Sequence, residues 1–272
     1  HLKAPNDAVT LEYAVFGIYF ASDLLSVSRV LQNGKRITYL LCYAAWSERM
    51  LKIWGRPTSA CTQKALWGLE EAGVDYELTL ASGTMGPDGH VSKGGAAFGI
   101  VDTPEYRDMN PNGTVPTIDD DGFILWESNV IVRYLAMKYA PDKMYGSDVQ
   151  TFASASRWMD WEQTKFLPEQ HILVMNLVRL PPDERDPAAV EEARVSLLRP
   201  LGMLEEQLSK TAYVAGDAFT MGDIPIGMRV HRWFLFNLES PPMPNLARWY
   251  DAIQQRPAFK QHIEDAALHL SG

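Results

Sequence analysis

The sequence predicts an α/β domain followed by an all-α domain. Strand and helix patterns alternate between residues 52 and 140, whereas residues 150–268 carry helical patterns that no strand pattern interrupts. The length of 272 residues exceeds that of one typical domain and suggests two. We therefore expect domains at 50–140 and 150–272, joined by a polar, turn-rich linker at 141–149.

Residues 1–49 form an N-terminal extension of unknown role. Met50 directly precedes the first strand pattern, which suggests that the main fold begins there. The apolar content of 24–31 and 37–46 favours a helix or loose packing. No apolar run reaches the roughly 18–20 residues that span a bilayer, and the nearest candidate is 15–21, so we expect no membrane segment.

The first domain opens with a β-α-β pattern. Residues 52–55 form the first expected strand, a helix opens at 58–64 and runs to Gly73, and residues 76–80 form the second strand. Residues 110–113, Asn-Pro-Asn-Gly, are a strong turn signal. Val115-Pro116 follows, and a cis bond there would turn the Val115 backbone outward, where it can pair with an extended ligand.

A hairpin and a helix complete this domain. Residues 120–122, Asp-Asp-Gly, predict a tight turn, and 123–125 predict the strand that follows it. Ser128 opens a helix that Pro141 should end near residue 140. Glu127 and Ser128 therefore lie at a helix N-terminus, whose backbone N–H groups attract a carboxylate.

The second domain is expected to be helical throughout. Its helices are predicted at about 150–179, 187–209, 221–237, 245–255 and 257–268. Thr220 and Asp223 form a capping box, and Phe219 and Ile224 are placed to form its hydrophobic staple. Asp223 is therefore interpreted as a folding residue rather than an acid catalyst.

Composition and net charge limit which partners and metal sites the protein can be expected to have. The net charge of -9 argues against a nucleic-acid partner, because no basic stripe offsets phosphate charge. Cys42 and Cys61 make neither a disulfide framework nor a zinc site, and two thiols fit a reducing compartment such as the cytoplasm. His171 and His231 have no metal-ligand spacing, so they are interpreted as incidental and no metal is expected.

The proline turn, the hairpin and Glu127-Ser128 together resemble the glutathione-binding half of a glutathione S-transferase, and the resemblance covers roughly residues 50–265. It implies a thioredoxin-like first domain, a helical second domain and a bacterial, serine-type (theta-like) cytosolic enzyme. It also implies glutathione as co-substrate, an electrophilic small molecule as second substrate, a homodimer and a role in detoxification.

The resemblance places the sulfur chemistry at the start of the first helix. Ser59 matches the hydroxyl of serine-type members, and it also fits an ordinary helix N-cap. Cys61 lies two residues on, where some members of the wider superfamily form a mixed disulfide. It also fits buried packing. Thr58 is a third candidate for the hydroxyl.

The resemblance also implies the anchors for glutathione. Val115, preceding Pro116, would pair its backbone with the cysteinyl part, Glu127 would hold the γ-glutamyl amine, and Ser128 would bind the γ-glutamyl carboxylate. Thr114 stands where the family often has lysine, which weakens the expected site for the glycine end. The Gly-, Ser- and Lys-rich loop at 82–99 would border the cleft.

Two further expectations concern the helical domain and the alternatives. In the segment 157–161, Trp158 and Trp161 are expected in the core, while Arg157 or Asp160 would reach glutathione or a partner subunit. Cys61 keeps a glutathione-dependent disulfide reductase as one alternative. A non-catalytic scaffold of this fold is the other, because fold alone does not settle function.

Overall fold

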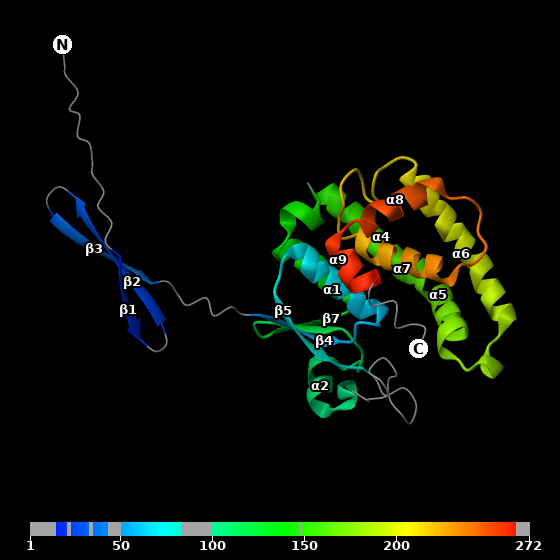
Figure 1. Ribbon diagram of the computed structural model, residues 1–272, viewed down its shortest axis with the longest axis horizontal. Helices are drawn as coiled ribbons and strands as arrows, with labels where there is room; N and C mark the ends of the chain where they lie inside the picture. The colour runs from blue at the N-terminus through cyan, green and yellow to red at the C-terminus, as the bar shows by residue number, and fades with distance from the viewer. Residues whose placement is uncertain are drawn as a thin grey trace, which may run out of the picture. The chain divides into compact units, whose positions relative to one another are not determined.

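The computed structural model describes residues 50–82, 99–146 and 148–264, and the backbone of 15–20, 23–32 and 35–42. Contacts divide the chain into two compact units, residues 1–49 and 50–272. The first unit contains the antiparallel strands β1 (Val15–Phe20), β2 (Asp23–Gln32) and β3 (Lys35–Cys42), which pair in chain order (Figure 1). The helix or loose packing expected here was wrong, because polar and apolar residues alternate from Leu25 to Ser28, a strand period.

The second unit begins with a four-stranded mixed sheet in the order β5-β4-β6-β7. Its strands are β4 (Leu51–Gly55), β5 (Tyr76–Leu80), β6 (Thr117–Asp120) and β7 (Phe123–Trp126). β4 runs parallel to β5 and antiparallel to β6, and the hairpin of β6 and β7 turns at Asp121 and Gly122. Both turn residues have positive φ, 57° and 88°, as a two-residue type I′ hairpin requires, so the predicted hairpin is confirmed.

Two helices pack on this sheet and form its core. α1 (Ala60–Ala72) and α3 (Ser128–Lys138) bury apolar side chains against β4 and β6. Gly73 ends α1 in the left-handed conformation, with φ 67°. A short helix, α2 (Pro104–Met109), was not predicted, although Thr103 caps it by accepting from the Tyr106 N–H group and Pro104 stands at its first position.

The rest of the unit is helical (Figure 1). Its main helices are α4 (Val149–Lys165), α5 (Leu167–Val174), α6 (Pro187–Leu208), α7 (Asp223–Phe236), α8 (Pro244–Gln254) and α9 (Pro257–Phe259). Short turns occupy Pro141–Tyr145, Met175–Arg179, Pro182–Glu184 and Lys260–Glu264. The single helix predicted over 150–179 was wrong: it breaks at Phe166, where Pro168 enters the first turn of α5.

The predicted capping box at the start of α7 is present in part: the N-cap is Gly222, which makes no side-chain cap bond, but Asp223 bonds back to the Thr220 N–H group. Asp223 is fully buried and accepts from the N–H groups of Thr220 and Val214, at 2.9 and 3.0 Å, and from the Trp249 indole. Burial raises the pKa of its carboxyl to about 6, against the effect of these donors. Phe219 and Ile224 are buried beside it, so Asp223 acts in folding, as predicted.

A buried ion network joins the sheet domain to the helical domain. Glu162 of α4 is fully buried, and its carboxylate lies 3.4 Å from Lys64 Nζ of α1 and 2.5 Å from Arg229 Nε of α7. Asn129 of α3 donates to the same carboxylate at 3.1 Å. Burial disfavours the charge of Glu162, but Lys64 and Arg229 hold its pKa below the ordinary range.

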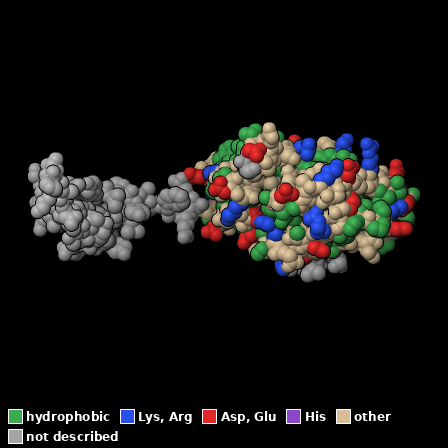
Figure 2. All heavy atoms as spheres, turned by 90° about the horizontal axis from the view of Figure 1, so that it is seen from above, with side chains coloured by type: hydrophobic (Ala, Val, Ile, Leu, Met, Phe, Trp, Pro, Cys, Tyr) green, Lys and Arg blue, Asp and Glu red, His purple; other side chains and the backbone are tan. Residues whose placement is uncertain are grey.

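The face of the second unit seen in Figure 2 carries acidic and basic side chains interspersed with apolar ones. No helix in the described ranges combines the length and the apolar character needed to cross a bilayer.

Candidate functional site

The register of the sheet brings three predicted segments to one edge. Trp54, near the end of β4, pairs with Thr117 at the start of β6, and Thr117 pairs with Trp126 at the end of β7. The chain therefore leaves β4 toward Ser59, enters β6 from Val115 and leaves β7 toward Glu127 at the same edge. Segments that lie far apart in the sequence thus converge where two helices, α1 and α3, begin.

Ser59 is the N-cap of α1. Its side chain is nearly buried, and its Oγ accepts from the Thr62 N–H group at a long 3.4 Å. A hydroxyl that accepts here can still donate its own proton to a third group. The neighbouring Thr58 is engaged differently, because its Oγ1 accepts from Arg56 Nη1 at 2.9 Å. Ser59 lines the cavity at the start of α1 and Thr58 does not, so Ser59 is the hydroxyl better placed to donate to a ligand.

Cys61 stands at the second position of α1 as a partly exposed free thiol. Cys61 and Ser59 line the same cavity, so the fold does not separate the two candidates for the sulfur chemistry. The alternative in which Cys61 is simply buried packing is wrong, since the side chain is partly exposed.

The peptide bond between Val115 and Pro116 is cis, as expected. Val115 is half-buried and lies outside the ladder between β4 and β6, which begins at Thr117. The turn before it is held by Tyr106, whose hydroxyl donates to the Thr114 carbonyl at 2.7 Å. Asn110 donates to the same carbonyl at 3.0 Å. The Thr114 backbone is therefore committed to the turn, while its side chain is exposed.

Glu127 and Ser128 form the N-terminus of α3. Glu127 is exposed and has φ 71°, a conformation that costs a non-glycine residue roughly 1–3 kcal/mol. Its carbonyl accepts from the Ile131 N–H group at 2.9 Å, and Ser128, the first residue of the helix, is buried. Such strain occurs mainly at functional sites. The N-terminus of a helix is a type of site that can bind an anion through its N–H groups.

A cavity of about 280 Å³ opens beside the start of α1. It is lined by Ser59, Ala60 and Cys61, by the apolar residues Leu167, Val174 and Met175, and by Arg56, His171, Arg179, Arg229 and Arg232. Val115, Glu127 and Ser128 are not among its lining residues. His171, which the sequence analysis interprets as incidental, lies in this wall.

The four arginine residues give this cavity its charge. Burial, and then the charge of Arg179, lower the pKa of Arg56 to about 10. Burial, and then the charge of Arg229, lower the pKa of Arg232 to about 9. Arg229 reaches Glu162, whereas Arg232 contacts neutral oxygens, the Thr58 carbonyl at 3.4 Å and Gln63 at 3.5 Å. Positive charges therefore crowd one another around the cavity.

The sequence analysis did not predict this cationic wall, which the four arginine residues of the cavity form. Its members stand at positions 56, 179, 229 and 232, and only the tertiary fold brings them together. Arg56 alone carried a signal, because it lies between a predicted strand and Ser59. Within the described ranges, no group of His, Cys, Asp and Glu side chains could hold a metal ion. Residues 83–98, nearly all of the predicted cleft loop, lie outside the described residues.

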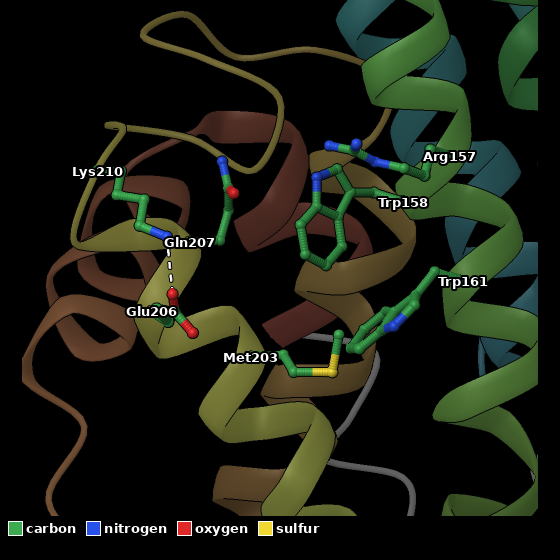
Figure 3. Close-up of a pocket in the computed structure, with 7 residues that line it drawn as sticks. All are labelled: Arg157, Trp158, Trp161, Met203, Glu206, Gln207 and Lys210. Carbon is green, nitrogen blue, oxygen red and sulfur yellow. Dashed lines mark hydrogen bonds and ion pairs between the residues drawn. The ribbon is translucent and has the colours of Figure 1, made fainter.

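A second hollow, of about 350 Å³, lies between α4 and α6 (Figure 3). Trp158 and Trp161 form its aromatic wall, with their rings packed edge to face and their ring centroids 5.1 Å apart. Met203 of α6 faces them. Trp158 is buried in the core as expected, and Trp161 is only partly buried. Arg157 lies over the Trp158 ring here, and the exposed Asp160 forms an ion pair with Arg133. Neither Arg157 nor Asp160 lines the cavity at Ser59.

Comparison with known proteins matches both parts of this fold. The family model "Glutathione S-transferase, N-terminal domain" matches residues 58–138, and "Glutathione S-transferase, C-terminal domain" matches residues 169–257. Glutathione S-transferase GstB of Escherichia coli is 37% identical over 216 residues, which cover 79% of this chain and 98% of that protein. Glutathione S-transferase 3 of Zea mays is 31% identical, covering 81% and 95%.

A solved structure gives the same result. The theta class glutathione S-transferase of Xanthomonas axonopodis pv. citri, with glutathione bound, superposes with a TM-score of 0.71 at 39% sequence identity. The match covers 79% of this chain and 97% of that one.

Proposed function

Because the chain belongs to the glutathione S-transferase family, we propose that it activates the thiol of glutathione for attack on an electrophilic small molecule. The observation that carries this proposal is the convergence of Ser59, Val115 and Glu127-Ser128 at one edge of the sheet. The residues proposed to bind glutathione lie in the domain of 50–140, and the helical domain of 150–272 supplies most of the adjoining cavity.

The chemical task is to form a thiolate at neutral pH. The thiol of glutathione should have the pKa of a cysteine, about 8.5, so only a few per cent is ionised at pH 7. Lowering that pKa by about 2 units needs roughly 2.7 kcal/mol of preferential stabilisation of the anion. A hydrogen bond from Ser59, the N-terminus of α1 and the positive charges of Arg56 and Arg232 act in this direction.

Each part of glutathione has a proposed anchor. The exposed Glu127 carboxylate binds the γ-glutamyl amine, and Ser128 with the N–H groups of α3 binds the γ-glutamyl carboxylate. The backbone of Val115, which lies outside the ladder between β4 and β6, pairs with the cysteinyl part. Thr114 contributes an exposed neutral side chain at the glycine end.

One second function has an observation in its favour. Cys61 is a free thiol on the wall of the same cavity as Ser59, an arrangement that supports glutathione-dependent disulfide reduction through a mixed disulfide. The scaffold alternative fits less well, because a scaffold needs neither the strained Glu127 backbone nor a cationic cavity beside Ser59.

We further propose a cytoplasmic homodimer that acts in detoxification. Exposed apolar side chains on β7 and α3, namely Phe123, Trp126, Val130 and Met137, support an interface, as does the hollow beside Met203. A two-fold axis would use each of these two surfaces twice. Sedimentation equilibrium of the purified chain decides the oligomeric state.

The glutathione site is tested by Glu127→Ala and Ser128→Ala. Each loses a hydrogen bond to a charged group, which costs roughly 1.5–3 kcal/mol, so calorimetric affinity for glutathione should fall about 10- to 150-fold. Glu192→Ala removes an exposed helical carboxylate on α6 and serves as the matched control. Unchanged affinity in both site variants, with their fold intact, would refute this assignment.

A further inference from the structure

The glycine end of glutathione meets no charge from Thr114. Glutathione carries two carboxylates, and the N-terminus of α3 is proposed to bind the γ-glutamyl one. Thr114, at the proposed position of the glycine end, is exposed and neutral. Hydrogen bonds between a cation and a carboxylate are roughly twice as strong as those between neutral groups. A basic side chain beside this turn would therefore add affinity that Thr114 cannot supply.

Arg107 of α2 packs on the same turn. Gly113, the residue before Thr114, has φ 60° and no side chain. A Cβ atom added at Gly113 would stand 3.1 Å from Nη2 and 3.2 Å from Cζ of Arg107, so the guanidinium group lies against the backbone of the turn. The Arg107 side chain is 49% exposed, so its N–H groups are accessible to a ligand that binds at the turn.

The helix that carries Arg107 is fixed to the turn. Tyr106, the residue before Arg107, is buried, and its hydroxyl donates to the Thr114 carbonyl at 2.7 Å and lies 2.8 Å from Thr117 Oγ1. Asn110, which ends α2, donates to the same carbonyl at 3.0 Å. The base of the Arg107 side chain and the backbone of the turn therefore keep their relative positions before a ligand arrives, which lowers the entropic cost of binding.

The guanidinium group is held by a carboxylate at the surface. Arg107 Nη2 lies 3.1 Å from Asp102 Oδ1, and the two side chains are 49% and 55% exposed. Ion pairs this exposed contribute little to stability, so a ligand carboxylate can share or replace Asp102. Arg107 is the basic residue of α2, whose other charged residues, Glu105 and Asp108, are acidic and exposed. Without Arg107, a carboxylate that approaches α2 would meet like charges.

We propose that Arg107 binds the glycine carboxylate of glutathione and supplies the positive charge that Thr114 lacks. This inference rests on the proposed function and adds a binding residue to the same site. With the cysteinyl part opposite Val115, the next residue of an extended peptide lies roughly 3.3 Å further along, toward the turn on which Arg107 packs. A guanidinium fork binds a carboxylate in a bidentate way.

The test compares glutathione with its glycyl monoethyl ester, which keeps the thiol and the γ-glutamyl group but has no charge at the glycine end. By calorimetry the parent should bind glutathione about 10- to 150-fold more tightly than the ester, the range for hydrogen bonds to a charged group. Arg107→Gln should remove most of this preference by weakening glutathione alone. Arg107→Lys should keep part of it, and Thr114→Lys should restore part of it in the Arg107→Gln protein.

A kinetic measurement separates binding from distortion of the site. Arg107→Gln should raise KM for glutathione by the factor lost in affinity, while kcat at saturating glutathione and the pKa of the bound thiol stay near the parent values. Asp102→Asn breaks the same ion pair but keeps the cation, so it should retain the affinity for glutathione. Arg199→Gln removes an exposed arginine of α6 and should leave the preference for glutathione over the ester unchanged.

Three results would overturn the inference. If Asp102→Asn and Arg107→Gln weaken glutathione equally, the ion pair only supports α2. If Arg107→Gln weakens glutathione and the ester equally, the variant distorts the turn. If the parent binds glutathione and the ester equally well and conjugates both, the inference is wrong while the proposed function stands. A parent that binds neither compound would instead refute the proposed function, and the inference with it.

Discussion

Replacing Ser59 by alanine tests directly whether its hydroxyl stabilises the glutathione thiolate. The Ser59 side chain makes an N-cap bond, accepting from the Thr62 N–H group. We propose that it also donates a hydrogen bond to the glutathione sulfur. The cap bond is long, 3.4 Å, so its loss should lie at the low end of the usual range, roughly 0.5–1 kcal/mol of unfolding free energy. The variant should therefore fold.

The effect on the sulfur is larger. A hydrogen bond to a charged acceptor contributes about 1.5–3 kcal/mol, and one pKa unit corresponds to about 1.36 kcal/mol. Ser59→Ala should therefore raise the pKa of bound glutathione by roughly 1–2 units. If the parent pKa is about 6.5, the thiolate fraction at pH 7 falls from about three quarters to about 24% or 3%, so conjugation at pH 7 should slow by about 3- to 25-fold.

The assay follows the ultraviolet absorbance of the bound thiolate against pH for the parent, Ser59→Ala and Ser59→Thr. The threonine variant keeps a hydroxyl and should restore part of the shift. Cys61→Ser should leave conjugation nearly unchanged if Ser59 governs the sulfur. If Cys61 is the nucleophile instead, oxidised glutathione should leave an adduct on it that intact-mass analysis detects. A thiol pKa that does not move in Ser59→Ala would refute the serine assignment.

Two further predictions concern the structure around the site. Glu162→Gln leaves Lys64 and Arg229 buried without a carboxylate, so the free energy of unfolding should fall by about 3–5 kcal/mol and the melting temperature by roughly 6–20 °C. Glu191→Gln removes one partner of an exposed ion pair with Arg194 and should change the melting temperature little in the same experiment. Equal decreases in melting temperature for Glu162→Gln and Glu191→Gln would contradict this prediction. His231 is buried, and burial, then the charge of Arg232, lower its pKa from 6.5 to about 4. As the pH falls from 7 to 4, the unfolded chain binds a proton at His231 that the folded chain does not bind. In urea titrations the free energy of unfolding of the parent should therefore fall by up to about 3 kcal/mol relative to that of His231→Asn. A difference in unfolding free energy between the two proteins that stays constant with pH would contradict this prediction.

The edge of the sheet could be predicted because its signals are local. Asp121 and Gly122 specify a turn by their tolerance of positive φ, Pro116 restricts the backbone at its own position, and serine, as at position 128, is common at helix starts. Such residues act through their own geometry, so no knowledge of distant contacts is needed. The strand boundaries and the start of α3 were therefore found within one or two residues.

The helical domain was less predictable for a physical reason. A helical period at 150–179 does not reveal the break at Phe166, because α4 and α5 both continue the apolar pattern across it. In α7 every residue from Asp223 to Trp233 is buried, so periodicity cannot tell which face meets α1. Arg229 and Arg232 lie three residues apart on that helix, and only the fold turns them toward Ser59.

The net charge of the chain and the charge of its cavity lead to opposite expectations about anions. A net charge of -9 argues against an extended polyanion such as a nucleic acid, which must lie along the surface. Exposed charges further away than the Debye length, about 8 Å at physiological salt, are largely screened. A small ligand in a cavity of about 280 Å³ therefore responds mainly to the guanidinium groups that line it. Composition alone therefore predicts only the partners that bind outside the cavities of a protein.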